Sequence, residues 1–70
     1  MITYNVRTIH ADGRILADLY AGTDTELRDR AVFRGMTAMA DPASLIAAVD
    51  ILTATPGQTN TVRTIERAAL

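Results

Sequence analysis

The sequence predicts a single small α+β domain of β-β-α-β-β layout, with one antiparallel sheet and one helix packed on one of its faces. Three observations predict it. Residues 23–40 have the composition of a helix, the segments on both sides are rich in β-branched residues, and turn residues divide those segments into pairs. At 70 residues, the chain is expected to form one domain over residues 1–70.

The helix is expected to begin with a capping box at Thr23 and Glu26, in which the threonine side chain accepts from the amide of Glu26 and the glutamate returns the bond. No proline interrupts the run that follows. Asp41-Pro42 ends it, because a residue before proline is disfavoured in the helical conformation. Gly35 is unfavourable inside a helix, and we expect it to allow close approach of the helix to the sheet.

Two strands are expected before the helix, at residues 2–10 and 14–20, joined by a turn at Asp12-Gly13. The first alternates between apolar and polar side chains until Ile9 breaks the pattern, which indicates an edge or a bulge. The second is expected to alternate without a break, so that Leu19 and Tyr20 point to opposite faces.

After the helix, residues 41–44 are expected to cap a second, short helical turn. Residues 45–55 fit either a helix or a strand, and we expect a strand over 48–55. Pro56-Gly57 marks a turn, and residues 61–67 form the last expected strand. Residues 68–70 are expected to fray, with a short helix over 66–70 as the alternative.

The tetrapeptide Val-Arg-Thr-Ile occurs twice, at residues 6–9 and 62–65. Shared strand composition is one explanation, because all four residues suit a strand. The alternative is that the first and last strands occupy equivalent places in a pseudo-symmetric sheet. The sequence leaves both open.

The composition excludes several classes of function. There is no cysteine, so no disulfide and no cysteine-based zinc site exist. The formal net charge is -1, whereas a nucleic-acid-binding protein usually has a basic excess, so the charge disfavours a nucleic-acid partner. The first residues do not form a signal peptide, and no apolar run approaches the ~20 residues that span a bilayer. A soluble intracellular protein without membrane contact is expected.

No constellation of residues predicts catalysis. His10 is the only histidine, lacks a nucleophile beside it, and is expected to lie on the surface at a strand end. Most carboxylates have local explanations, such as Asp12 in a turn and Asp41 at a cap. The glycines are too dispersed for a phosphate loop. We therefore expect a non-enzymatic protein with no catalytic residue, no metal and no cofactor.

The helix carries more apolar surface than one contact needs. The surplus stripe consists of Val32, Phe33, Met36 and Met39. Either all four belong to the core, or part of the stripe is a homodimer or partner surface, since methionine is frequent at binding surfaces. Arginines flank the stripe, and interfaces favour aromatic residues, methionine and arginine. The expected partner-binding residues are Arg30, Phe33, Arg34 and Met36.

Four segments carry a resemblance to a known family. They are the turn Asp12-Gly13-Arg14 with the strand at 15–20, the link Ala21-Gly22-Thr23-Asp24, the helix ending at Ala40, and the strand near Val49-Ile51-Leu52. Their layout resembles that of small phage-encoded anti-CRISPR proteins of β-β-α-β-β arrangement, particularly some that act on type I systems. The resemblance implies an inhibitor in the cytoplasm of a bacterial host, whose partner is a CRISPR effector complex. Because the chain is nearly neutral, steric blocking suits it better than mimicry of nucleic acid.

Two other functions stay open. The first is a small nucleic-acid-binding module that uses Arg7, Arg63 and the helix arginines to contact phosphates. The second is a structural phage or mobile-element protein whose self-association completes its small core, since a chain of this length buries only roughly 60% of its unfolded surface.

Overall fold

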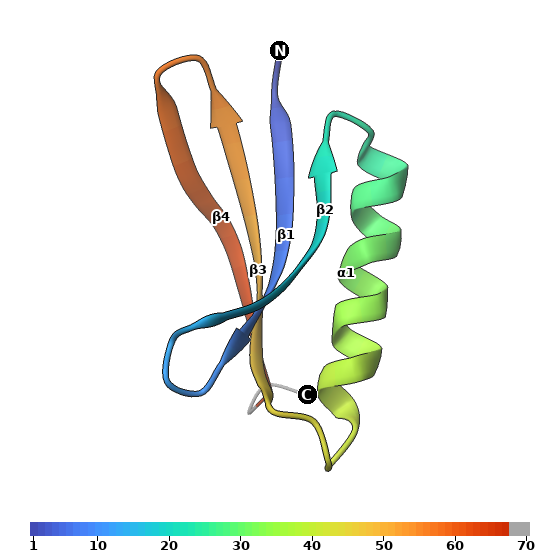
Figure 1. Ribbon diagram of the computed structural model, residues 1–70. Helices are drawn as coiled ribbons and strands as arrows, with labels where there is room; N and C mark the ends of the chain where they lie inside the picture. The colour runs from blue at the N-terminus through green and yellow to red at the C-terminus, as the bar shows by residue number, and fades with distance from the viewer. Residues whose placement is uncertain (68–70) are drawn as a thin grey trace.

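The computed structural model describes residues 1–67, apart from the side chains of residues 59, 61 and 62. The elements follow one another as β1 (Thr3–His10), β2 (Ile15–Gly22), α1 (Thr25–Ala40), β3 (Ile46–Thr55) and β4 (Gln58–Glu66). The strands form one antiparallel sheet in the order β2-β1-β3-β4, and α1 packs on one of its faces, roughly along the strands (Figure 1). The predicted α+β class and β-β-α-β-β layout are confirmed, and residues 68–70 lie outside the described part.

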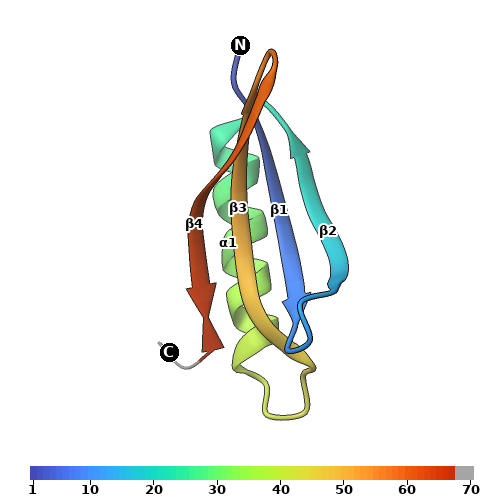
Figure 2. The same ribbon diagram turned by 90° about the vertical axis from the view of Figure 1, so that its left-hand side faces the viewer.

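The core lies between α1 and the face of the sheet that the helix covers. Residues paired across neighbouring strands share a face, and the pairs Val6–Ile51 and Thr8–Val49 are buried. Val49 also pairs with the buried Ile65 of β4. The buried residues of α1 are Ala31, Gly35 and Met39. In Figure 2 the sheet is seen from its other face, with α1 behind it, and no described element covers that side.

The N-cap of the helix lies one residue later than the sequence predicts. Asp24, and not Thr23, is the N-cap, and its Oδ1 accepts from the amides of Glu26 and Leu27 at 2.8 and 3.2 Å. Aspartate caps a helix at least as well as threonine, and its charge interacts favourably with the positive end of the helix dipole. The helix ends before the proline, where the sequence predicts it.

The segment after α1 is a turn and not the second helical turn that the sequence predicts. The Oδ1 of Asp41 accepts from the amide of Ala43 at 2.9 Å, and its carbonyl oxygen accepts from the amide of Ser44 at 2.9 Å. These local bonds give the backbone an alternative to the helix. β3 then begins at Ile46, two residues earlier than predicted, so the ambiguous segment is a strand after this turn.

Five other strand boundaries differ from those predicted, and two of them are the starts of β1 and β2, which each lie one residue late, at Thr3 and Ile15. β4 begins at Gln58 instead of residue 61, because the turn at Pro56-Gly57 is tight enough for Thr55 to pair with Gln58. Gly57 has a φ of 83°, which only glycine adopts readily. β4 ends one residue early, at Glu66, and β2 continues beyond the predicted end to Gly22.

β2 does not alternate without a break. Its register against β1 shifts twice, and each shift leaves one residue of β2 without a partner. At one of these bulges, Leu19 and Tyr20 both pack against the core, although the sequence predicts opposite faces for them. The break that the sequence predicts at Ile9 is confirmed, since the register shifts beside it on both neighbouring strands.

The two Val-Arg-Thr-Ile copies are not equivalent. Both lie on strands that border β3, but Arg7 pairs with Asp50 whereas Arg63 pairs with Ile51. An offset of one residue turns corresponding side chains to opposite faces of a sheet. Arg7 therefore points away from α1 and Arg63 points toward the helix side, which rejects pseudo-symmetry and leaves shared strand composition as the explanation.

Gly35 allows α1 to approach the sheet, as the sequence predicts. A Cβ at this position would lie 3.1 Å from Leu19 Cδ1 and 3.1 Å from Val49 Cγ2. Val49 is fully buried and β-branched, so it has little freedom to move. We expect Gly35→Val to lower the free energy of unfolding, measured in urea, by about 1–3 kcal/mol through overpacking.

The control for this substitution is Ala38→Val, at an exposed position of the same helix. It adds a β-branched residue without crowding the sheet, so only helix propensity is lost, a change below about 1 kcal/mol. Equal losses in the two variants would show that close approach at Gly35 does not matter for stability.

Candidate protein-interaction site

The structure separates the four predicted contact residues. Arg30, Phe33 and Arg34 are exposed, and Phe33 is 72% exposed. Met36 is half-buried and packs against the core. Within the predicted apolar stripe, Met39 is fully buried and Val32 is half-buried, so most of the stripe is core and only Phe33 faces solvent. Hydrophobic periodicity alone did not distinguish these two roles.

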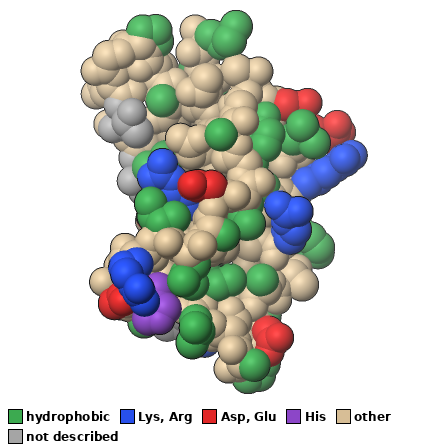
Figure 3. Space-filling view, in the orientation of Figure 1, with side chains coloured by type: hydrophobic (Ala, Val, Ile, Leu, Met, Phe, Trp, Pro, Cys, Tyr) green, Lys and Arg blue, Asp and Glu red, His purple; other side chains and the backbone are tan. Residues whose placement is uncertain are grey.

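A groove of about 280 Å³ lies between α1 and the edge strand β2, and we call it the α1–β2 groove. It is lined by Leu19, Tyr20, Leu27, Arg30, Ala31 and Arg34. Leu27 is 44% exposed, so the groove presents apolar surface to solvent as well as charge. Figure 3 shows the basic side chains along α1, with apolar side chains between them and β2.

The two arginines of this groove, Arg30 and Arg34, are not ion-paired within the described residues. They lie one helical turn apart. Other arginines do make ion pairs: Arg7 with Asp18, Arg14 with Asp12 and Arg28 with Asp29. Arg34 Nη2 donates to the carbonyl oxygen of Leu19 at 3.4 Å, a long bond that places the guanidinium near β2. The groove therefore offers two arginines to an anionic group.

Tyr20 fixes the end of the groove next to the helix N-terminus. Its hydroxyl oxygen accepts from the amide of Asp24 at 2.8 Å. Its ring lies against Gly22, where an added Cβ would come within 2.5 Å of the hydroxyl oxygen. A larger residue at this position would have to displace the Tyr20 ring, whose hydroxyl makes the hydrogen bond to Asp24. The sequence marked the link from β2 to α1 as ordinary capping and contained no signal for the tyrosine contact.

A second groove, of about 230 Å³, lies on the opposite flank of α1. It is lined by Arg28, Asp29, Val32, Ile51 and Arg63. Arg28 Nη2 lies 2.9 Å from Asp29 Oδ1, and its guanidinium carbon lies 4.5 Å from the centroid of the Tyr4 ring. Because a carboxylate already binds Arg28, this groove attracts anions less strongly than the α1–β2 groove.

The arginines that the nucleic-acid hypothesis groups together do not share one surface. Arg7 lies on the uncovered face of the sheet, 3.0 Å from Asp18. Arg63 lies on the helix side beside β3, whereas Arg30 and Arg34 lie in the groove beside β2. Contact with a phosphate backbone needs several cations along one surface. This dispersal gives the nucleic-acid hypothesis no support.

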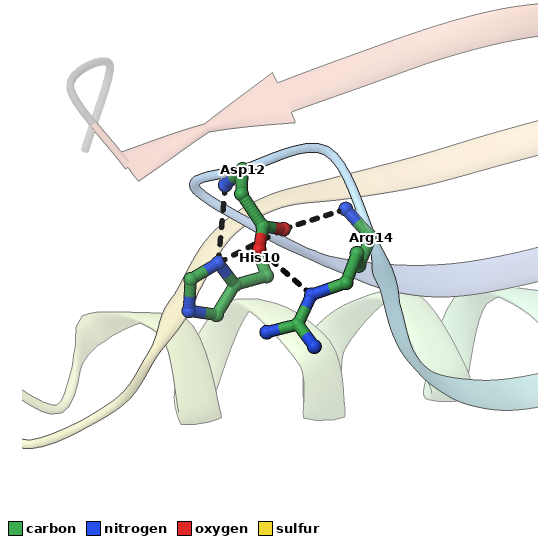
Figure 4. Close-up of polar contacts among 3 residues, drawn as sticks. All are labelled: His10, Asp12 and Arg14. Carbon is green, nitrogen blue, oxygen red and sulfur yellow. Dashed lines mark hydrogen bonds and ion pairs between the residues drawn. The ribbon is translucent and has the colours of Figure 1, made fainter.

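His10 is the last residue of β1 and lies next to the turn that joins β1 to β2 (Figure 4). Its Nδ1 lies 3.0 Å from the amide nitrogen of Asp12 and 3.1 Å from Asp12 Oδ1. The unprotonated nitrogen accepts from the amide, and the protonated ring donates to the carboxylate. The two interactions are alternatives, one for each protonation state, and either one links His10 to Asp12 in the turn. The imidazole is half-buried at the strand end, where the sequence predicts a surface histidine.

The same turn lowers the pKa of Asp12. The amide of Arg14 donates to Asp12 Oδ1 at 2.9 Å, and Arg14 Nε donates to Oδ2 at 2.7 Å. The amide hydrogen bond is the largest cause, and the arginine side chain and His10 act in the same direction. We expect the carboxyl carbon of Asp12 to titrate by NMR with a midpoint below the ordinary value of about 3.9.

In Arg14→Ala, this midpoint is expected to rise only in part, because the backbone amide remains as a donor. The stabilisation that Asp12 gives the folded state is fully present above the ordinary pKa. It is lost as the pH falls through the lowered pKa of the folded state. A wild-type midpoint at or above the ordinary value would contradict the turn geometry.

Within residues 1–67, no group of three or more histidine, aspartate or glutamate side chains is placed to hold a metal ion. Over the same residues, no helix has the length and apolar character needed to cross a membrane. No family model, curated protein or solved structure matches the chain. The candidate site therefore rests on the geometry of the α1–β2 groove and Phe33.

Proposed function

We propose that this chain is a non-enzymatic inhibitor or modulator that binds a larger prokaryotic protein complex through the α1–β2 groove and Phe33. The observation that carries the proposal is the pair Arg30 and Arg34, without ion-pair partners among the described residues, in an apolar groove beside a phenylalanine that is 72% exposed. Protein interfaces are enriched in aromatic residues and arginine, and such residues often carry most of the binding energy.

The two kinds of residue have different roles in this proposal. Phe33 leaves most of its ring in water, and burying such a side chain against a partner contributes roughly 1.5–3 kcal/mol. Arg30 and Arg34 form charge-assisted hydrogen bonds with carboxylates of the partner. Arg30 is three residues before Phe33 on the helix, so one partner surface reaches both.

The target that we propose is a type I CRISPR effector complex, in the cytoplasm of a bacterial host. The support is the resemblance of the β-β-α-β-β layout to small phage-encoded anti-CRISPR proteins. The net charge of -1 favours steric blocking through a protein contact, because a mimic of nucleic acid needs a strongly acidic surface. No reaction step is involved, and inhibition follows from occupancy alone.

A pull-down with the tagged chain tests the proposal against purified type I effector complexes, with mass spectrometry of the bound proteins. We expect at least one effector subunit to be retained in near-stoichiometric amount, and we expect nuclease treatment to leave this retention unchanged. Retention that nuclease removes would favour the nucleic-acid module. Retention of the chain alone would favour a self-associating structural protein, and both outcomes would overturn the effector as the target.

A further inference from the structure

The outer edge of β2 is open to another strand. β2 pairs with β1 on one side, and no strand of the described residues pairs with it on the other. Its first two residues, Ile15 and Leu16, are 51% and 42% exposed. Of the features that commonly prevent pairing at sheet edges, β2 lacks lysine and proline, and it contains one charged residue, Asp18, and two bulges that leave only short stretches for pairing. Such an edge accepts an extended segment through backbone hydrogen bonds.

The α1–β2 groove lies beside this edge. Alternate side chains of a strand added to β2 would point to the helix side, where Arg30 and Arg34 line the groove. Figures 1 and 2 show α1 running along the strands and not across them. The rise between alternate strand residues is roughly 6.6–6.8 Å, close to the rise of about 6.0 Å along the axis between helix residues four apart. Two successive side chains on this side of a strand therefore match the spacing of the two arginines.

Charge and shape together identify the occupant. The groove is lined by two arginines and no carboxylate, so the side chains that point into it are expected to be acidic. The two bulges in β2 shorten its regular edge, so the added strand is short. Arg34 also reaches the carbonyl of Leu19 at 3.4 Å, a long bond that a carboxylate of the partner replaces.

We infer that this chain binds a short, extended, acidic segment of its partner protein, which adds to β2 as a fifth strand and places its carboxylates at Arg30 and Arg34. The inference rests on the proposed function and specifies the chemistry of the segment that the site takes. It requires both backbone pairing and charge, and each requirement can be removed separately.

The first probe is an acetylated, amidated hexapeptide of alternating glutamate and valine, added to the isotope-labelled full chain and followed by NMR. We expect shifts of the amide resonances of β2, with little change in β4, the other edge strand. A hexapeptide of alternating lysine and valine is expected to bind at least tenfold more weakly. N-methylation of alternate residues keeps the charge but blocks pairing on one edge, and one of the two methylated patterns is expected to abolish binding.

The second probe is the variant Arg30→Glu/Arg34→Glu. We expect at least a tenfold loss of affinity for the glutamate peptide and a gain for the lysine peptide. Arg63→Glu, on β4, reverses one charge away from the groove, serves as the control for each single reversal Arg30→Glu and Arg34→Glu, and is expected to bind as the wild type does. Circular dichroism of each variant checks that it is folded. If a variant does not fold, the methylated peptides still test backbone pairing on the wild-type chain.

Three results would overturn the inference. The peptides show no binding at millimolar concentration, both methylated patterns bind as well as the parent, or the shifts are confined to the outer side of α1 around Phe33. Each of these leaves the proposed function intact if the pull-down still retains an effector subunit. If the pull-down retains no effector subunit but the glutamate peptide still shifts the amide resonances of β2, the chain has an acidic-peptide site whose partner is not a CRISPR complex.

Discussion

Replacing Met39 with alanine is expected to lower the free energy of unfolding by about 2–5 kcal/mol. Met39 is the largest of the fully buried side chains, and it packs in the last turn of α1 within the single core cluster of the described residues. Truncation removes buried apolar surface and leaves a cavity that the surrounding strands close only in part. A domain of 70 residues has a total stability of roughly 4–10 kcal/mol, so this one change removes a large share of it.

Urea denaturation followed by circular dichroism measures this effect. Met39→Leu is the matched control, because it nearly conserves volume and is expected to cost less than about 1.5 kcal/mol. Met36→Ala is expected to cost less than Met39→Ala, since Met36 is only half-buried. A loss below about 1 kcal/mol for Met39→Ala would contradict the packing of α1 on the sheet.

The double variant Arg30→Glu/Phe33→Ala is expected to abolish capture of the effector complex and its inhibition while leaving the fold intact. The substitution reverses one of the two groove charges and removes the exposed aromatic ring. Loss of one central anchor in an interface typically costs at least about 2 kcal/mol of binding free energy, more than tenfold in affinity. Both residues are exposed, so stability in urea is expected to change by less than about 1 kcal/mol.

The matched control combines the same kinds of change elsewhere on the surface. Leu45→Ala removes an apolar side chain that is 69% exposed, and Arg63→Glu reverses an exposed charge on β4. This control variant is expected to capture and inhibit as the wild type does. Wild-type inhibition by Arg30→Glu/Phe33→Ala would remove the α1 surface from the proposal, and equal loss in the control would point to a non-specific charge effect.

The layout was predictable because each element has a local signal. The alternation around Val6, the glycine turns and Asp41-Pro42 place the strands and the helix without tertiary information. The errors arose where local signals compete. Thr23 and Asp24 are both good caps, and only the geometry at the amides of the first turn decides between them. The bulge that turns Leu19 and Tyr20 to the same face depends on pairing with β1, which no pattern within β2 contains.

The candidate site was predictable only in part. Helical periodicity identified Arg30, Phe33 and Arg34 as neighbours, and all three are exposed. Met36, the fourth predicted contact residue, is half-buried against the core. Whether a residue at its position faces the core or solvent depends on the rotation of α1 about its axis, which helical periodicity does not determine. Leu19 and Tyr20, which complete the groove, come from a different element and were not predictable as partners of the arginines. Sites that form between elements require the register and packing of both.

The position of β1 in the middle of the sheet has a consequence for how the chain folds. The hairpins β1–β2 and β3–β4 each join neighbouring segments, whereas the β1–β3 ladder joins residues as far as 51 apart, such as Thr3 and Ala54. Closing so long a loop costs entropy before any contact is gained, and an isolated hairpin is at best marginally stable in water. Docking of the two hairpins through β1 and β3 is therefore expected to be the slow step, and this domain is expected to fold more slowly than a helical bundle of equal length.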